Sequence, residues 1–149
     1  MEFLIHFHLM AAMAWIGGSI FMFVLGVSLR DKSKQQQVYP NIGPIFGYFE
    51  IVSLIILLVS GILMADDKGL FYGLLDGDTS PIGTVFYNKM MIVLFVIIFT
   101  MIHFVVALKT NKKERTKLQN FLSRSSSLMV LFLNLVVLHY AIMLRSMLN

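Results

Sequence analysis

The sequence predicts an all-α integral membrane protein, a four-helix bundle with both termini on the outer side of the membrane. Three observations predict this fold class: 58% of the residues are hydrophobic, only 13% are charged, and the apolar residues fall in four long stretches. Soluble domains carry about 25% charged residues on average. Neither an ordinary soluble domain nor a disordered chain is therefore expected, and residues 1–149 form one predicted domain.

Four stretches that are nearly free of charge define the spans, because a bilayer core about 30 Å thick requires about 20 apolar residues in a helix. The predicted spans lie near residues 3–28, 45–65, 84–108 and 125–146. The second span includes one acidic residue, Glu50. Polar segments separate the spans and are expected to be loops, and the first of them runs from Arg30 to a break at Pro40.

The charges between the spans predict the orientation, because Lys and Arg are enriched in cytoplasmic loops. The first and third connections are basic and contain Arg30, Lys32, Lys34, Lys109, Lys112, Lys113, Arg115, Lys117 and Arg124. The middle connection is acidic and contains Asp66, Asp67, Asp76 and Asp78 against Lys68. We therefore expect both termini outside, in a bacterial inner membrane. The lipid surface accounts for the basic loops, so no nucleic-acid partner is expected.

Ionisable residues within the spans are candidate functional groups, because they are costly in lipid and usually face the bundle interior. At about 1.5 Å per helical residue, His8, Lys89 and His139 fall into one layer in the outer half of the membrane. Glu50 and His103 fall near the cytoplasmic end, where they could pair. His103 is about 21 Å from Lys89 along the helix and cannot share a small site with the outer layer.

The absence of cysteine limits the cofactors that the chain can hold. It excludes disulfides, cysteine-ligated clusters and C-x-x-C-H haem attachment. Histidines on facing helices of a bundle can hold haem b without a covalent link. The residues therefore predict haem b, with His8 as one axial ligand and either His139 or Lys89 as the second.

Copper is the alternative cofactor, because imidazole and thioether ligands suit Cu(I). Such groups cluster at the outer end of the first span, at Met1, His6, His8, Met10 and Met13. Methionines also lie at the same end of the third and fourth spans, at Met90, Met91, Met143 and Met147.

Residues 8–18 read His-Leu-Met-Ala-Ala-Met-Ala-Trp-Ile-Gly-Gly, so that Trp15 follows His8 by seven residues and precedes Gly17 and Gly18. This motif resembles the first-span pattern of the CopD/HemJ-like membrane proteins, and the four-span plan and small size are similar to theirs. The HemJ branch is a haem-b-binding protoporphyrinogen IX oxidase, and the CopD branch is named for copper resistance. The resemblance implies a haem pocket shaped by Trp15, Gly17 and Gly18.

The resemblance also implies that His8 and Lys89 are the functional pair. The HemJ branch has a Lys at the start of its third span in a W-x-x-x-K setting, and here Lys89 has that place while Val85 stands where the Trp would be. That branch has an Arg shortly after the first-span Gly and an Asn-Glu pair entering span four. This chain has residues 21–23 (Phe-Met-Phe) and Arg124 followed by three serines in those places.

We therefore expect a haem-b-binding inner-membrane redox protein. It would either oxidise protoporphyrinogen IX, as HemJ does, or transfer electrons between a membrane carrier such as quinone and a respiratory partner, with the haem supplying the chemistry. A copper-handling protein and an accessory subunit of a larger membrane complex are the alternatives. The chain is expected to form a homo-oligomer or to join such a complex, and the sequence assigns no catalytic residue.

Overall fold

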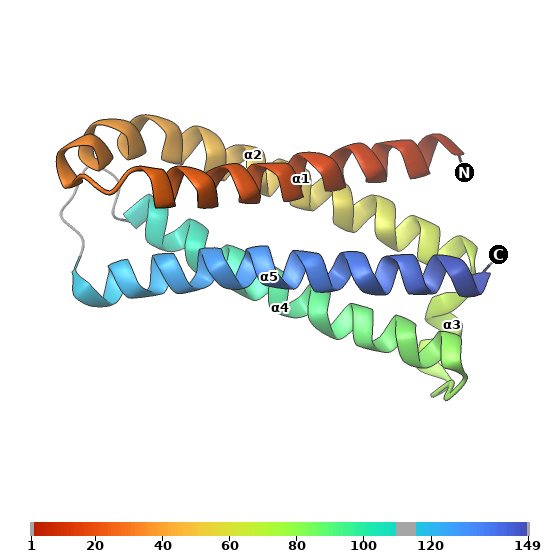
Figure 1. The fold of residues 1–149 in the computed structure, drawn as a ribbon. Helices are drawn as coiled ribbons and strands as arrows, with labels where there is room; N and C mark the ends of the chain where they lie inside the picture. The colour runs from red at the N-terminus through yellow and green to blue at the C-terminus, as the bar shows by residue number, and fades with distance from the viewer. Residues whose placement is uncertain (1, 110–115, 149) are drawn as a thin grey trace.

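The computed structural model describes residues 2–109 and 116–148, which are almost wholly helical. The helices in chain order are α1 (Glu2–Ser28), α2 (Lys32–Asp67), α3 (Leu70–Leu75), α4 (Pro81–Lys109) and α5 (Lys117–Leu148). The four long helices each run antiparallel to the next and form one bundle (Figure 1). The predicted all-α four-helix bundle is confirmed, and α3 is a short helix that the sequence did not predict.

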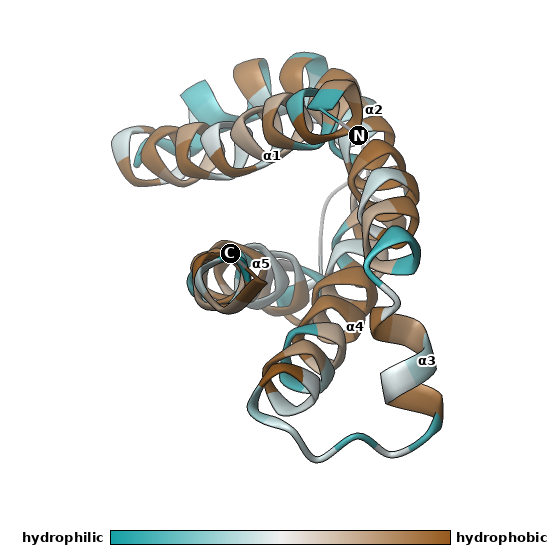
Figure 2. Cartoon of the chain, turned by 90° about the vertical axis from the view of Figure 1, so that its right-hand side faces the viewer, coloured by the Kyte–Doolittle hydropathy of each residue, from teal (hydrophilic) through white to brown (hydrophobic). Residues whose placement is uncertain are grey.

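Each of the four long helices is long and apolar enough to cross a membrane. Apolar residues lie on all sides of these helices, as Figure 2 shows in brown. Phe3, Ile45 and Phe132 are 74%, 73% and 61% exposed. A helix that is apolar all round belongs in a protein core or in lipid, and these side chains are not in the core. The chain is therefore a multi-pass membrane protein.

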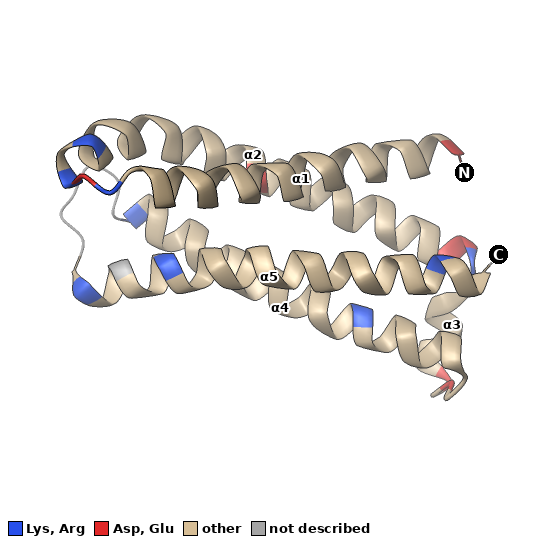
Figure 3. Ribbon diagram, viewed as in Figure 1, with Lys and Arg blue, Asp and Glu red and all other residues tan. Residues whose placement is uncertain are grey.

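Charged residues gather at the two ends of the bundle (Figure 3). We call the end that contains the α1–α2 connection the basic end, and its described cations are Arg30, Lys32, Lys34, Lys109, Lys117 and Arg124. The opposite, acidic end contains both ends of the chain and the region around α3, with Asp66, Asp67, Asp76 and Asp78. Lys112, Lys113 and Arg115 of the predicted basic loop lie outside the described residues.

The interior is built from two clusters of buried side chains. The α1–α2 and α4–α5 pairs pack most extensively, and contacts of α1 with α5 and of α2 with α4 close the bundle. The central core takes one buried residue from each long helix: Trp15, Leu54, Val96 and Val130. The second cluster lies next to α3 and contains Ala65, Val85, Phe86 and Leu144. It includes no residue of α1, so the first turns of α1 are held mainly by α2.

Two helices begin at caps that are visible in the sequence. Ser80 stands immediately before Pro81, and its Oγ accepts a hydrogen bond from the Gly83 N–H at 3.1 Å; Ser at the N-cap and Pro at the first position are typical of a helix start. Before α5, the Thr116 N–H donates to Gln119 Oε1 at 3.0 Å and the Gln119 N–H donates to Thr116 Oγ1 at 3.2 Å. This reciprocal pair is a capping box, which starts α5 within a polar segment.

The prediction of a polar loop after the first span is wrong. α2 continues through Pro40 and Pro44, so only residues 29–31 separate it from α1. Each interior proline removes one backbone hydrogen bond of the helix. Beside the two prolines, the Asn41 side-chain amide donates to the Gln37 carbonyl oxygen at 2.9 Å. The start of α2 is therefore helical although it is too polar for the lipid core.

Candidate functional site

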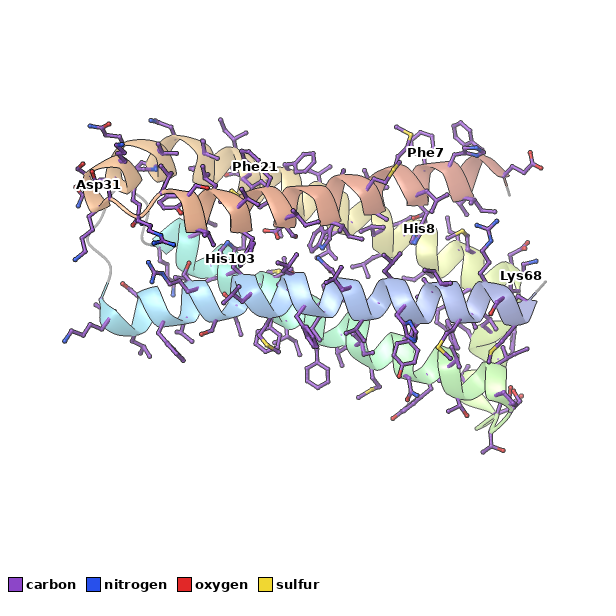
Figure 4. All side chains as sticks on the ribbon, viewed as in Figure 1. Phe7, His8, Phe21, Asp31, Lys68 and His103 are labelled. Carbon is purple, nitrogen blue, oxygen red and sulfur yellow. The ribbon has the colours of Figure 1, made fainter. Side chains whose placement is uncertain are left out.

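His8 of α1 packs against α2 in the half of the bundle nearest the acidic end. Its Nδ1 lies 2.7 Å from Ser60 Oγ. A Cβ placed on Gly61 would lie 3.4 Å from His8 Cε1, so the ring rests against α2 where that helix has no side chain. The ring is half-buried, and Figure 4 shows it on the side of α1 that faces the other helices.

Ser60 determines the tautomer of His8. Ser60 Oγ lies 2.5 Å from the Ile56 carbonyl oxygen, which can only accept, so the hydroxyl proton is directed there. Ser60 Oγ must then accept from the Nδ1–H of His8. In the neutral ring the other nitrogen, Nε2, carries a lone pair, and the Leu57 backbone carbonyl is a further acceptor for the ring N–H. One nitrogen fixed by an acceptor and the other available is the arrangement of a metal-ligating histidine.

Lys89 of α4 lies at a depth similar to that of His8. Counted from the acidic end, Lys89 lies about 12 Å along α4, and His8 lies about 9 Å along α1. The Lys89 side chain is half-buried, but the described parts of α1 and α4 do not pack against each other. The structure thus places these two predicted ligands at one level without a contact between their helices. We call the group the outer site, which comprises His8, Ser60, Gly61 and Lys89.

His139 lies at a similar depth on α5 but on a different face. Its side chain is exposed, and its ring packs edge-on against Tyr140 with the ring centroids 6.0 Å apart. Within the described residues, no hydrogen bond or ring contact joins His139 to His8 or Lys89. The structure therefore does not join His139 to either of the other two predicted ligands.

The remaining residues of the 8–18 motif lie away from the outer site. Trp15 belongs to the central core and is 2% exposed. A Cβ on Gly18 would lie 2.9 Å from Phe46 Cε2 of α2, whereas a Cβ on Gly17 would meet nothing within 4 Å. Between about 10 and 15 Å of helix separates Trp15, Gly17 and Gly18 from His8. In this structure Trp15 and Gly18 pack against other helices.

Of the predicted copper ligands at the start of α1, Met1 lies outside the described residues, and no hydrogen bond joins His6 to His8. His6 is exposed, and its Nδ1 lies 2.7 Å from the Glu2 carbonyl oxygen of its own helix. Met10 and Met13 are 62% and 67% exposed. Residues 2–109 and 116–148 contain no group of three or more His, Asp or Glu side chains that could hold a metal ion.

A buried polar layer lies beside the central core and was missed from the sequence. Each long helix adds one buried polar residue, one turn nearer the basic end than its core residue. The four are Ser19, Glu50, Thr100 and Ser126, with exposures of 7%, 6%, 0% and 2%. Each stands four residues from a core residue, but the sequence does not show that the core residues share one cluster.

The pairing of Glu50 with His103 that the sequence allowed does not occur in the structure. His103 Nδ1 lies 3.3 Å from the Ser123 carbonyl oxygen of α5, and the described residues show no ion pair between His103 and Glu50. Figure 4 shows His103 toward the basic end of the bundle and His8 toward the acidic end. His103 is therefore separate from the outer site, as predicted.

Within the described part of the chain, the outer site combines a half-buried imidazole, a hydroxyl that orients it and a half-buried amine at a similar depth. The chain matches no family model, no curated protein and no solved structure.

Proposed function

We propose that the chain is a haem-b-binding membrane redox protein in which His8 supplies an axial ligand through Nε2. The hydrogen bonds from His8 to Ser60 and from Ser60 to Ile56, at 2.7 and 2.5 Å, carry this proposal. In the neutral ring they place the proton on Nδ1, leave the lone pair on Nε2 and fix the orientation of the ring. In metal proteins, an acceptor that is hydrogen-bonded to the non-ligating ring N–H fixes the tautomer and orientation of a ligating histidine in the same way.

The surroundings of His8 support the same proposal. Gly61 has no side chain beside the ring, so the ring packs directly against α2, which limits its movement. Lys89 is one candidate for the second ligand because it is half-buried at a depth similar to that of His8, and an amine ligates in its neutral form. His139 is the other candidate. Haem b bound there would supply the redox chemistry, while these side chains set its ligation and orientation.

The test is a visible spectrum of the detergent-purified full chain, oxidised and then reduced with dithionite, from cells supplied with a haem precursor. A Soret band with sharp reduced α and β bands is expected. His8→Ala should abolish these bands, whereas His6→Ala should leave them unchanged. His6 is the matched control, since it lies two residues away on the same helix and is bonded only to α1. A colourless wild-type protein would overturn the proposal.

Variants of the two remaining candidates identify the second ligand. If Lys89 ligates, Lys89→Ala converts the low-spin spectrum to a high-spin one and His139→Ala does not. The reverse result assigns the ligand to His139. A protein without haem that binds Cu(I), and loses it in Met10→Leu and Met13→Leu, would establish the copper function instead.

A second assay separates the two redox roles. Purified protein is mixed with protoporphyrinogen IX, and the appearance of fluorescent protoporphyrin IX is followed. Turnover that is lost in His8→Ala indicates an oxidase of the HemJ type. Haem without turnover, but with reduction by a quinol, indicates an electron carrier.

A further inference from the structure

The side chain of Glu50 lies within the membrane-spanning bundle, away from the charged ends. Glu50 of α2 is 6% exposed, and no hydrogen bond or ion pair joins it to any other described residue. An ionised carboxylate is strongly disfavoured in such surroundings unless a cation or hydrogen bonds compensate it. Glu50 therefore requires either a proton or a bound cation.

Contacts between α2 and α4 place Glu50 level with Thr100. A Cβ on Gly47 would lie 3.3 Å from Phe104 Cδ2. Gly47 is therefore level with Phe104. The two helices are antiparallel, so moving three residues forward along α2 corresponds to moving three or four residues back along α4. Glu50 follows Gly47 by three residues and is thus level with the residue three or four positions before Phe104. Thr100 is four positions before Phe104 and is completely buried.

Contacts between α1 and α2 bring Ser19 to the same region. A Cβ on Gly18 would lie 3.4 Å from Cε1 of Phe49, the residue before Glu50. Ser19 is buried, donates its hydroxyl to the Trp15 carbonyl oxygen at 3.0 Å and receives the Asn134 side-chain amide at 3.5 Å. Glu50 is thus bordered by polar groups on both helices against which it packs.

Two buried hydrogen-bond donors also lack a partner, one in this layer and one in the adjacent central core. Thr100 Oγ1 and Trp15 Nε1 are buried and have no hydrogen-bond partner among the described residues. Buried donors are almost always satisfied, and where protein groups do not satisfy them an internal water does. A water molecule can accept from these donors and donate to a carboxyl group, which a metal cation cannot do. The donors therefore favour a hydrated acid over a metal site.

No charged side chain compensates Glu50 from the helices packed around it. α1 carries no titratable residue between His8 and its end. On α4, Lys89 is about 16 Å of helix away from Thr100, and His103 is directed to a carbonyl oxygen of α5. Tyr48 of α2 and Arg124 of α5 are exposed, and α3 lies at the acidic end.

We propose that Glu50 is an intramembrane proton-binding site. One proton from water combines with the carboxylate, and internal water accepts the hydrogen bonds offered by Thr100 and Trp15. The apolar side chains of the central core separate this layer from the outer site, so the proton exchanges with the basic end. The proposal does not depend on haem, because none of its observations involve His8 or Lys89.

The test is infrared difference spectroscopy of the full chain in lipid vesicles at neutral pH. Subtracting the spectrum of Glu50→Gln from that of the wild type isolates the Glu50 band. We expect the carbonyl stretch of a protonated carboxylic acid, which shifts in D2O because its proton exchanges. Glu2→Gln is the control, since Glu2 is exposed and its subtraction should show only ionised carboxylate bands.

Thr100 provides a second measurement that keeps Glu50 in place. Thr100→Val should move the protonated-acid band, and Thr100→Ser should restore it, because the hydroxyl takes part in the same hydrogen-bonded water. Ionised carboxylate bands for Glu50 would overturn the proposal. If those bands also move when K+ replaces Na+, the layer is a metal-cation site instead. A protonated band that Thr100→Val leaves unchanged would overturn the role of the water.

Discussion

Ser60 is the residue on which the chemistry of His8 depends. Ser60→Ala removes the hydroxyl that accepts from the Nδ1–H, so the ring is freer to rotate or change tautomer. Loss of such a partner costs about 10–100-fold in metal affinity in other proteins, and we expect haem affinity to fall by about tenfold or more. The measurement is haem transfer to apomyoglobin, followed by the loss of the Soret band.

Ser53→Ala is the matched control for that variant. Ser53 is buried at 5% exposure on the same helix, two turns nearer the basic end, so it reports the general cost of removing a buried hydroxyl. Equal haem release from Ser53→Ala and Ser60→Ala would show that the His8–Ser60 bond does not support ligation.

The depth of each ionisable side chain could be predicted from the sequence, but its facing direction could not. His8, Lys89 and His139 were placed in one layer, and in the structure His8 and Lys89 are half-buried while His139 is exposed. Depth follows from the 1.5 Å rise per residue. The direction in which a side chain points depends on how its helix is rotated about its own axis in the bundle. A single histidine on a helix that is apolar on all sides does not determine that rotation.

At the scale of helices, Gly18 determines how closely α1 and α2 pack. A Cβ there would come within 2.9 Å of Phe46, so Gly18→Ala forces the ring to move. Overpacking of this kind costs about 1–3 kcal/mol. We expect a lower midpoint of thermal unfolding in detergent, followed by circular dichroism.

Gly17→Ala provides the comparison, because a Cβ at this neighbouring position meets nothing within 4 Å. Alanine is a better helix former than glycine by about 1 kcal/mol, so Gly17→Ala should leave the unfolding midpoint unchanged or raise it. If Gly17→Ala lowers the midpoint as much as Gly18→Ala does, close α1–α2 packing is not the cause.

The turn between α3 and α4 is expected to depend on pH through Asp78. Hydrogen bonds from Ser80, first from its backbone N–H and then from its hydroxyl, hold the pKa of the Asp78 carboxyl below its ordinary value. A lowered pKa in the folded protein means that the carboxylate stabilises the turn at all pH values above the unfolded value of about 3.9. This contribution is lost only as the pH falls through the lower, folded value.

Amide hydrogen exchange measures this effect at Ser80 and Gly83, after correction for the intrinsic pH dependence of exchange. Protection of both amides should persist through mildly acidic pH and fall in strong acid, and Asp78→Asn should remove that fall. Loss of protection already near pH values where a histidine titrates would contradict the role of Asp78.

The positions of the spans were predictable at this scale, but the full lengths of the helices were not. A hydropathy criterion finds the residues that lie in lipid, whereas caps decide where helices begin. α2 starts at Lys32 and α5 at Lys117, both in polar segments. The predicted pair of Glu50 with His103 is absent because the His103 ring is directed to the Ser123 carbonyl oxygen of α5, and hydropathy does not determine that direction.

At the scale of the molecule, the central core divides the bundle into two polar compartments. His8 and Lys89 lie toward the acidic end, and Glu50 lies on the other side of Trp15, Leu54, Val96 and Val130. Eleven residues of α1, about 16 Å, separate His8 from Ser19. Electron chemistry on one side and proton binding on the other would thus occur in separate layers of one bundle.

The orientation of these compartments follows from the segregated charges in Figure 3. Because Lys and Arg favour the cytoplasmic side, we expect the basic end inside the cell and the outer site near the opposite surface.

The chain contains no cysteine, so single cysteines report sidedness without background. In intact spheroplasts, Thr79→Cys at the acidic end should react with a membrane-impermeant maleimide, and Ser33→Cys at the basic end should react only after the membrane is permeabilised. Both positions are exposed, so accessibility within the protein is matched. The reverse labelling pattern would place the outer site nearer the cytoplasm, and the proton held by Glu50 would then exchange with the external side.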